Sequence, residues 1–174
     1  KTGDGVSKKY SRAVELFQAS AGQNNASAQY WLGYMYETGK GTKKDLEKAY
    51  EWIRKSADQK LPEAQIKMGQ YLSNNKIIPK NDTELKWIEK AANEGDLASQ
   101  IMLGKMNLNG EYVKKDVTTA IKWLETAAEN GDVKSQYTLG AMYYSAQIVE
   151  ENIATAVIWY KKAAEQGHML SQFN

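Results

Sequence analysis

Apolar residues along this chain recur at helical spacing in two alternating patterns. In the first pattern Ala28, Leu32 and Tyr36 lie four residues apart, and Ala64 begins the same series 36 residues later. The second pattern spaces its apolar residues three or four positions apart, at Ala49, Trp52, Ile53 and Ala57. Residues three and four apart share one face of an α-helix, so each pattern predicts an amphipathic helix. The chain is therefore predicted to consist of helix pairs.

The two patterns together repeat with a period of 35 or 36 residues. One large apolar position marks each repeat: Leu16, Trp52, Trp87, Trp123 and Trp159. The first four of these are each followed, after 17 positions, by a glycine: Gly33, Gly69, Gly104 and Gly140. A glycine inside a helix costs about 1 kcal/mol relative to alanine, so its recurrence predicts a packing role, the close approach of a neighbouring helix. The recurring tryptophans are predicted to be core residues.

Helix ends are marked in the same places. Gly95, Gly131 and Gly167 suit the left-handed conformation that ends a helix, and Asp96 and Asp132 suit the N-cap of the next one. Helix pairs of fixed period bury their apolar faces by stacking, which predicts an all-α, right-handed α/α superhelix, or solenoid. We expect one solenoid domain made of a partial repeat 1–24, repeats 25–60, 61–95, 96–131 and 132–167, and the start of a further repeat at 168–174.

A known family carries the same motif. The pattern A-Q-x-x-L-G-x-x-Y-x-x-G-x-G, followed by D-x-x-K-A-x-x-W-x-x-K-A-A-x-x-G, resembles the Sel-one-like repeat, a relative of the tetratricopeptide repeat. Residues 28–41 and 45–57 carry it almost completely, and its second half returns at 116–131 and 156–167. The resemblance implies an adaptor in signalling, membrane-protein quality control or bacterial contact with a host. It further suggests a bacterial member, periplasmic or secreted, and the ends in mid-repeat suggest a piece of a longer array.

Composition narrows the chemistry that the chain can perform. The net charge is only +2, which argues against a protein that grips nucleic acid or an anionic membrane. Cysteine is absent, which excludes disulfides and thiolate catalysis, and His168 is the only histidine, which excludes a multi-histidine metal site. His168 occupies an N-cap position, so we expect a capping rather than a catalytic residue. No enzymatic activity, cofactor, metal or membrane insertion is expected.

Positions that vary between repeats are the candidates for binding. Those in the first helices are four, three and four residues apart and so share one face. Stacked together, these faces are expected to line a concave groove, whose partner-binding residues are predicted to be Trp31, Tyr34, Lys67, Gln70, Met102, Lys105 and Thr138.

The leading hypothesis is a non-enzymatic scaffold, monomeric or weakly oligomeric, that binds a protein or an extended peptide in this groove. The alternative is binding of a carbohydrate or cell-wall polymer through an aromatic patch at Trp31 and Tyr34.

Two further sets of residues admit two interpretations each. A glutamine recurs at Gln29, Gln65, Gln100, Gln136 and Gln172. Its constancy favours hydrogen bonding to the backbone of the adjacent repeat over a peptide clamp.

The helix connections of two repeats carry apolar residues at Ile77, Ile78, Ile148 and Val149. Local packing over the helix ends is favoured, and a contact patch along one edge is the alternative.

Overall fold

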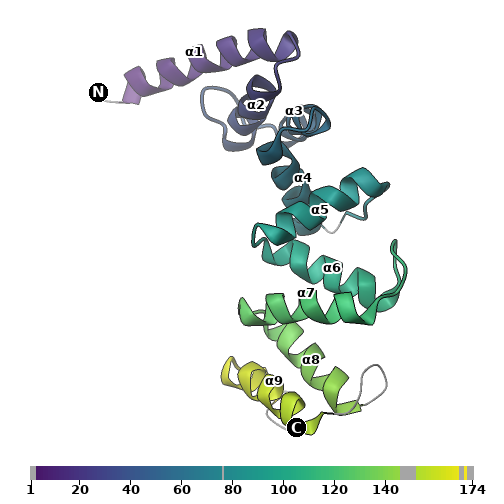
Figure 1. The fold of residues 1–174 in the computed structure, drawn as a ribbon. Helices are drawn as coiled ribbons and strands as arrows, with labels where there is room; N and C mark the ends of the chain where they lie inside the picture. The colour runs from purple at the N-terminus through teal and green to yellow at the C-terminus, as the bar shows by residue number, and fades with distance from the viewer. Residues whose placement is uncertain (1–2, 76, 146–151, 169–170, 172–174) are drawn as a thin grey trace. The chain divides into compact units, whose positions relative to one another are not determined.

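The computed structural model describes residues 3–75, 77–145, 152–168 and 171, and within them the regular structure is helical (Figure 1). The helices are α1 Gly3–Gly22, α2 Ala26–Thr38, α3 Leu46–Asp58, α4 Pro62–Asn74, α5 Asp82–Asn93, α6 Leu97–Asn109, α7 Val117–Glu129, α8 Val133–Ser145 and α9 Ile153–Glu165. The all-α prediction is confirmed for the described residues. Ile148 and Val149 lie outside them.

Helix ends follow the capping residues that the sequence places there. Asn25, Asp96 and Asp132 each accept a hydrogen bond from the backbone N–H three residues on, at 2.7–2.9 Å. Asp45 and Asp116 do the same for α3 and α7, and hydrogen bonds from Lys48 and Thr119, respectively, hold the pKa of each carboxyl below its usual value. These caps are therefore present at neutral pH and are lost as the pH falls through the lowered pKa.

The predicted left-handed glycines are confirmed. Gly95, Gly131 and Gly167 have φ angles of 92°, 92° and 84°. Such angles are readily available to glycine and disfavoured for residues with a Cβ, so each marks a helix end as expected.

The chain divides into two compact units, which are described separately. Unit 1 comprises Lys1–Tyr71 and Thr83–Ala91, and unit 2 comprises Leu72–Asp82 and Ala92–Asn174. In unit 1, α2 packs on α3 and on α1 around a core of Val14, Ala21, Ala28, Leu32, Met35, Tyr36 and Ala49. In unit 2, α6 packs on α7 and α8 packs on α7 and α9, with a core of Leu124, Ala128, Leu139, Met142 and Trp159.

The recurring helix glycines lie where the two helices of a repeat meet. A Cβ on Gly33 would collide with the side chain of Ile53, and one on Gly104 would lie 2.9 Å from Leu124. A Cβ on Gly69 would collide with the backbone carbonyl of Trp87. The predicted packing role is confirmed: the missing side chain lets the second helix of each repeat approach the first.

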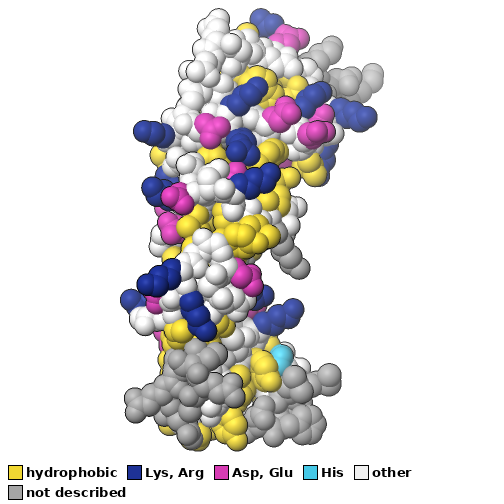
Figure 2. All heavy atoms as spheres, turned by 90° about the vertical axis from the view of Figure 1, so that its right-hand side faces the viewer, with side chains coloured by type: hydrophobic (Ala, Val, Ile, Leu, Met, Phe, Trp, Pro, Cys, Tyr) yellow, Lys and Arg dark blue, Asp and Glu magenta, His cyan; other side chains and the backbone are white. Residues whose placement is uncertain are grey.

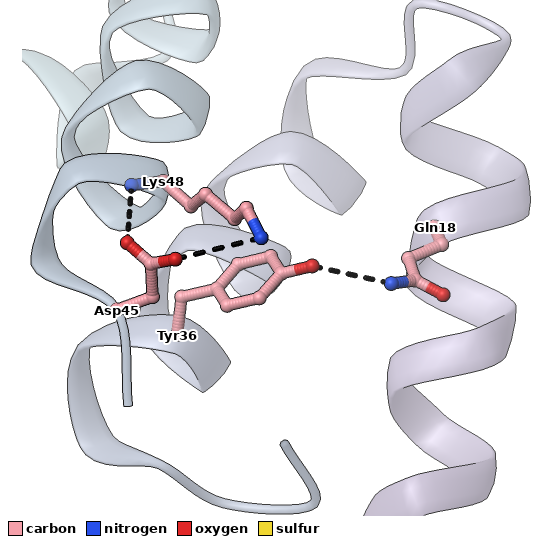
Figure 3. A network of polar contacts seen from close by, with 4 residues as sticks. All are labelled: Gln18, Tyr36, Asp45 and Lys48. Carbon is pink, nitrogen blue, oxygen red and sulfur yellow. Dashed lines mark hydrogen bonds and ion pairs between the residues drawn. The ribbon is translucent and has the colours of Figure 1, made fainter. Parts of the chain in front are cut away.

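Polar contacts join the three helices at the start of the chain (Figure 3). The Gln18 side chain on α1 donates a hydrogen bond of 3.2 Å to the Tyr36 hydroxyl on α2. The Lys48 ammonium lies 5.6 Å from the centre of the Tyr36 ring and 3.5 Å from Asp45. Tyr36 is thus held on both sides, by α1 through its hydroxyl and by α3 through its ring.

The prediction that the tryptophans are core residues is correct for two of the four. Trp87 and Trp159 are buried, whereas Trp52 and Trp123 are half-buried. The residue after each half-buried tryptophan faces the glycine of the first helix and is buried instead. Leu124 is 2% exposed, and Ile53 is 5% exposed. Leu16, at the same repeat position as the tryptophans, is exposed.

Gly69→Ala should destabilise the protein by about 1–3 kcal/mol, because the new methyl group meets backbone that cannot rotate away. The control is Gly22→Ala, since nothing lies within 4 Å of a Cβ there. We expect that variant to match the parent protein or to be slightly more stable. Urea unfolding followed by circular dichroism measures both, and equal free energies of unfolding for the two variants would contradict the packing role.

Leu124→Ala should cost about 2–5 kcal/mol as a truncation of a fully buried leucine. Trp123→Ala should cost less, although it removes more atoms, because the tryptophan is only partly buried and water can fill the space that it leaves. The two variants are compared by the same unfolding measurement. A larger loss for Trp123→Ala would restore the tryptophan as the core residue of this repeat.

Candidate binding surface

The residues predicted to bind a partner lie on the first helices of the repeats, and the structure gives them different surroundings. Four of them belong to unit 1, on α2 and α4, and three belong to unit 2, on α6 and α8. On the face drawn in Figure 2, hydrophobic side chains reach the surface in patches beside lysine and acidic side chains.

In unit 1, Trp31 is exposed and Tyr34 is half-buried. Their ring centres are 5.7 Å apart, but their planes are at 82°, so the two rings meet edge to face. The Lys40 ammonium lies 5.3 Å from the centre of the Tyr34 ring and 3.2 Å from its hydroxyl. That hydrogen bond raises the pKa of Lys40. The two rings do not form one flat platform, and the Tyr34 hydroxyl already accepts a hydrogen bond from Lys40.

The other two candidates of unit 1 lie on α4. The Lys67 ammonium pairs with the Glu37 carboxylate of α2 at 2.9 Å, and both side chains are half-buried. The two also line a hollow of only about 30 Å³ together with Tyr50 and Tyr71. Gln70 is half-buried. Lys67 therefore joins two helices, and little space remains beside it.

In unit 2, Met102 and Lys105 line a hollow of about 390 Å³ between the end of α4 and α6. Its other walls come from the two connections that flank these helices, through Ile78 and Tyr112. Ser73 lines the same hollow, and its hydroxyl lies 2.8 Å from that of buried Ser99.

A second hollow of about 760 Å³ lies between α6 and α8. Lys105 and Thr138 both line it, and Ile101 and Lys105 are common to the two hollows. The Thr138 hydroxyl donates to the Lys134 carbonyl at 2.7 Å. The structure thus brings Met102, Lys105 and Thr138 onto one surface with room for side chains of a partner.

Two residues of this surface were not among the predicted site residues. Ile78 is 44% exposed and Tyr112 is 57% exposed. The prediction that these residues pack locally over the helix ends does not fit Ile78, because its side chain is exposed. Ile77 beside it is half-buried. Tyr112 stands where the first repeat has Gly41, so the loss of that glycine is the sequence signal that could have identified it.

The recurring glutamines are used inside the fold. Gln100 and Gln136 are buried, and each donates to a carbonyl eight residues earlier, at 3.0 and 2.9 Å. Each also accepts a hydrogen bond from a side chain 30 residues later, Asn130 at 3.1 Å and Gln166 at 3.0 Å. The predicted structural role is confirmed for these two, because one amide connects the preceding repeat to the second helix of its own repeat. Gln172 lies outside the described residues.

His168 was predicted to cap a helix whose residues, apart from Ser171, lie outside the described ones. Its Nδ1 lies 2.9 Å from the Ser171 hydroxyl, the same three-residue spacing by which Asp96 accepts a hydrogen bond from Ser99. Its ring packs on Tyr137 at 4.6 Å between centres. Among the described residues, no cluster of three or more His, Cys, Asp or Glu side chains is arranged to hold a metal ion. None of the helices there is both long and apolar enough to span a membrane.

Comparison with known proteins adds a family and several related structures. Five consecutive segments match the family described as the Sel1 repeat, at residues 1–25, 26–61, 62–96, 97–132 and 133–168. The search of curated proteins found no match.

Among solved structures, the chain is similar to a Sel1 repeat protein from Oxalobacter formigenes, with 33% identity and a TM-score of 0.58 over 92% of this chain and 66% of that one. It is also similar to a protective antigen of uropathogenic Escherichia coli that displays an SLR fold, with 35% identity and a TM-score of 0.61 over 91% of this chain and 34% of that one. A third similar structure is Helicobacter pylori cysteine rich protein B, with 26% identity and a TM-score of 0.53 over 74% of this chain and 93% of that one. This chain spans less than two thirds of the length of the first two.

Gln100→Met should destabilise the protein by about 1–3 kcal/mol, because a side chain of similar length loses both hydrogen bonds of a buried amide. Gln65→Met is the matched control at the same repeat position. Gln65 is half-buried, its bond to the Ala57 carbonyl is longer, at 3.4 Å, and its oxygen accepts from the Lys90 ammonium at 2.9 Å. A smaller loss is expected, because water can hydrate the half-buried Lys90 ammonium once the amide is gone. Thermal unfolding followed by circular dichroism measures both variants. No loss of stability in Gln100→Met would return the glutamines to the list of candidate binding residues.

Proposed function

Because the chain belongs to the Sel1 repeat family, whose repeats generally mediate protein–protein interaction, we propose that it is a non-catalytic scaffold for an extended segment of another protein. The segment would lie along the first helices of unit 2, across the two hollows that share Lys105. The observation that carries this proposal is the position of those hollows, on the helix face whose residues differ from repeat to repeat.

The division between constant and variable positions supports this location. Constant residues of the first helices are occupied inside the stack: Gly104 admits the adjacent helix, and Gln100 connects two repeats. Met102, Lys105 and Thr138 neither admit an adjacent helix nor connect two repeats. An apolar side chain that becomes fully buried in a hollow contributes about 1.5–3 kcal/mol, so two such side chains would give a useful affinity.

Carbohydrate binding at Trp31 is the second candidate, because that indole is 46% exposed. A sugar would find no flat aromatic platform there, since the plane of Tyr34 stands at 82° to that of Trp31 and Lys40 holds the Tyr34 hydroxyl. Protein interfaces often use a single exposed aromatic residue as an anchor, and this favours Trp31 as a second contact for the same protein partner.

A bacterial setting forms part of the proposal. The two similar structures with 33% and 35% identity come from Oxalobacter formigenes and uropathogenic Escherichia coli. The second is described as a protective antigen. This supports a role for the present chain in contact between a bacterium and its host.

Site-specific photo-crosslinking in source cells tests the proposed surface. A photoreactive amino acid is introduced at Met102 or Thr138, in the hollows, and at Lys122, exposed on α7, as the control. We expect one protein to be crosslinked from the first two positions and not from Lys122. Crosslinking from Lys122 alone, or equally from all three positions, would contradict the assignment.

Two single substitutions separate the two candidate functions. Lys105→Ala should weaken retention of the crosslinked protein by about tenfold, whereas Trp31→Ala should leave a measurable part of it. Binding of a cell-wall polysaccharide that is lost in Trp31→Ala and fully kept in Lys105→Ala would instead favour the carbohydrate.

A further inference from the structure

We propose that the hollow between α4 and α6 binds one large apolar side chain of the partner, and that Lys105 pairs with a carboxylate next to that side chain. This inference rests on the proposed function and names the chemistry of the bound segment: a bulky apolar residue beside Asp or Glu.

The backbone of Tyr112 adopts an unusual conformation. Its φ is 65°, in the left-handed region that is disfavoured for a tyrosine. Gly41 has the same role in the first repeat with a φ of 72°, and a Cβ there would collide with the backbone of Tyr10. In the third repeat a bulky side chain replaces that glycine.

The turn holds this strained conformation, and burial of the Tyr112 side chain does not compensate for its cost in free energy. The N–H groups of Gly110 and Glu111 both donate to the Met106 carbonyl, at 2.9 and 3.1 Å. The Tyr112 side chain remains 57% exposed and lines the hollow. Lys60 has a similar φ and is also exposed, so this conformation alone does not mark a site; at Tyr112 it places the side chain in the wall of the hollow.

The other walls suit a bulky apolar guest. Ile78 is exposed, yet its position is fixed by buried Pro79 after it and by the hydrogen bond of 2.8 Å from Ile77 N–H to the Leu72 carbonyl before it. Met102 supplies a flexible thioether that can adapt to the shape of a guest. Ala98 leaves space that larger residues fill at the same position elsewhere, as Glu63 and Lys134 do.

The charge of the surface around the hollow favours an acidic residue next to the apolar residue of the bound segment. Lys105 is the only charged side chain of α6, and Lys134 is the only one of α8. Within the described residues neither ammonium forms an ion pair, in contrast to Lys67. Glu111, the carboxylate that lines the hollow, accepts a hydrogen bond of 3.1 Å from Asn109. A carboxylate of the partner would therefore be attracted to Lys105, which both hollows share.

The test is selection of a phage-displayed library of random linear peptides on the full chain. Selected peptides are then labelled with fluorescein, and their binding is measured by fluorescence anisotropy. The variants are Tyr112→Gly, which suits the observed backbone and removes the ring, and Lys105→Glu, which reverses the charge. The matched control is Lys60→Gly: Lys60 has a φ of 66° and is exposed in unit 1, so this variant relieves the same kind of strain away from the hollow.

We expect the selected peptides to share a large apolar residue beside Asp or Glu. Each of Tyr112→Gly and Lys105→Glu should weaken their binding by about tenfold or more. Lys60→Gly should bind as the parent protein does. Tyr112→Gly should melt at the same temperature as the parent or higher, which separates lost binding from lost folding.

Peptides without this residue pair, peptides that bind Tyr112→Gly as tightly as the parent, or a selection that yields no binder would each overturn the inference. Its failure is distinguishable from failure of the proposed function. If the partner still crosslinks from Met102 and Thr138, the proposed scaffold function is retained and only the preference for an apolar residue beside an acidic one is rejected. If crosslinking occurs only from Lys122, the scaffold surface and the preference are both rejected.

Discussion

The close approach of two helices at one glycine is the constraint on which the rest of each repeat depends. At Gly104 the absent side chain makes room for Leu124, and at Gly33 it makes room for Ile53. In α3 and α7 the residue that meets the glycine is buried and the tryptophan before it is only half-buried, whereas α5 and α9 bury both residues. The variable residues of the first helices lie outside this contact, where Lys67 pairs with Glu37 and Lys105 stays exposed.

Much of the fold could be predicted from the sequence, because its signals are local or strictly periodic. Helix caps such as Asp96 act within three residues, and the recurrence of Gln100 and its counterparts at one position indicated an internal role. The tryptophan prediction was half right for a geometric reason. Positions 123 and 124 are about 100° apart on a helix, so both fall within a broad apolar stripe, and spacing alone does not choose between them.

The candidate site was predicted less completely because it depends on contacts between distant residues. Lys67 occupies a variable position, but Glu37, 30 residues earlier, neutralises it. Ile78 and Tyr112 belong to connections, whose paths do not follow from helical periodicity. Their convergence on α6 creates the hollow, so its shape emerges only when helices and connections are assembled.

The glutamine bridges have a consequence for how such a chain can change in length. Every described bridge uses a carbonyl eight residues earlier, and Gln29, Gln100 and Gln136 also accept from a side chain 30 residues later. Gln65 instead accepts from Lys90, 25 residues later and within the same repeat. Duplication or loss of one whole period restores both partners for each remaining amide. A break inside a period leaves a buried amide without one of them. Recombination between copies is thus tolerated only when it adds or removes whole repeats. The hydrogen bonds inside the array are then the same as before.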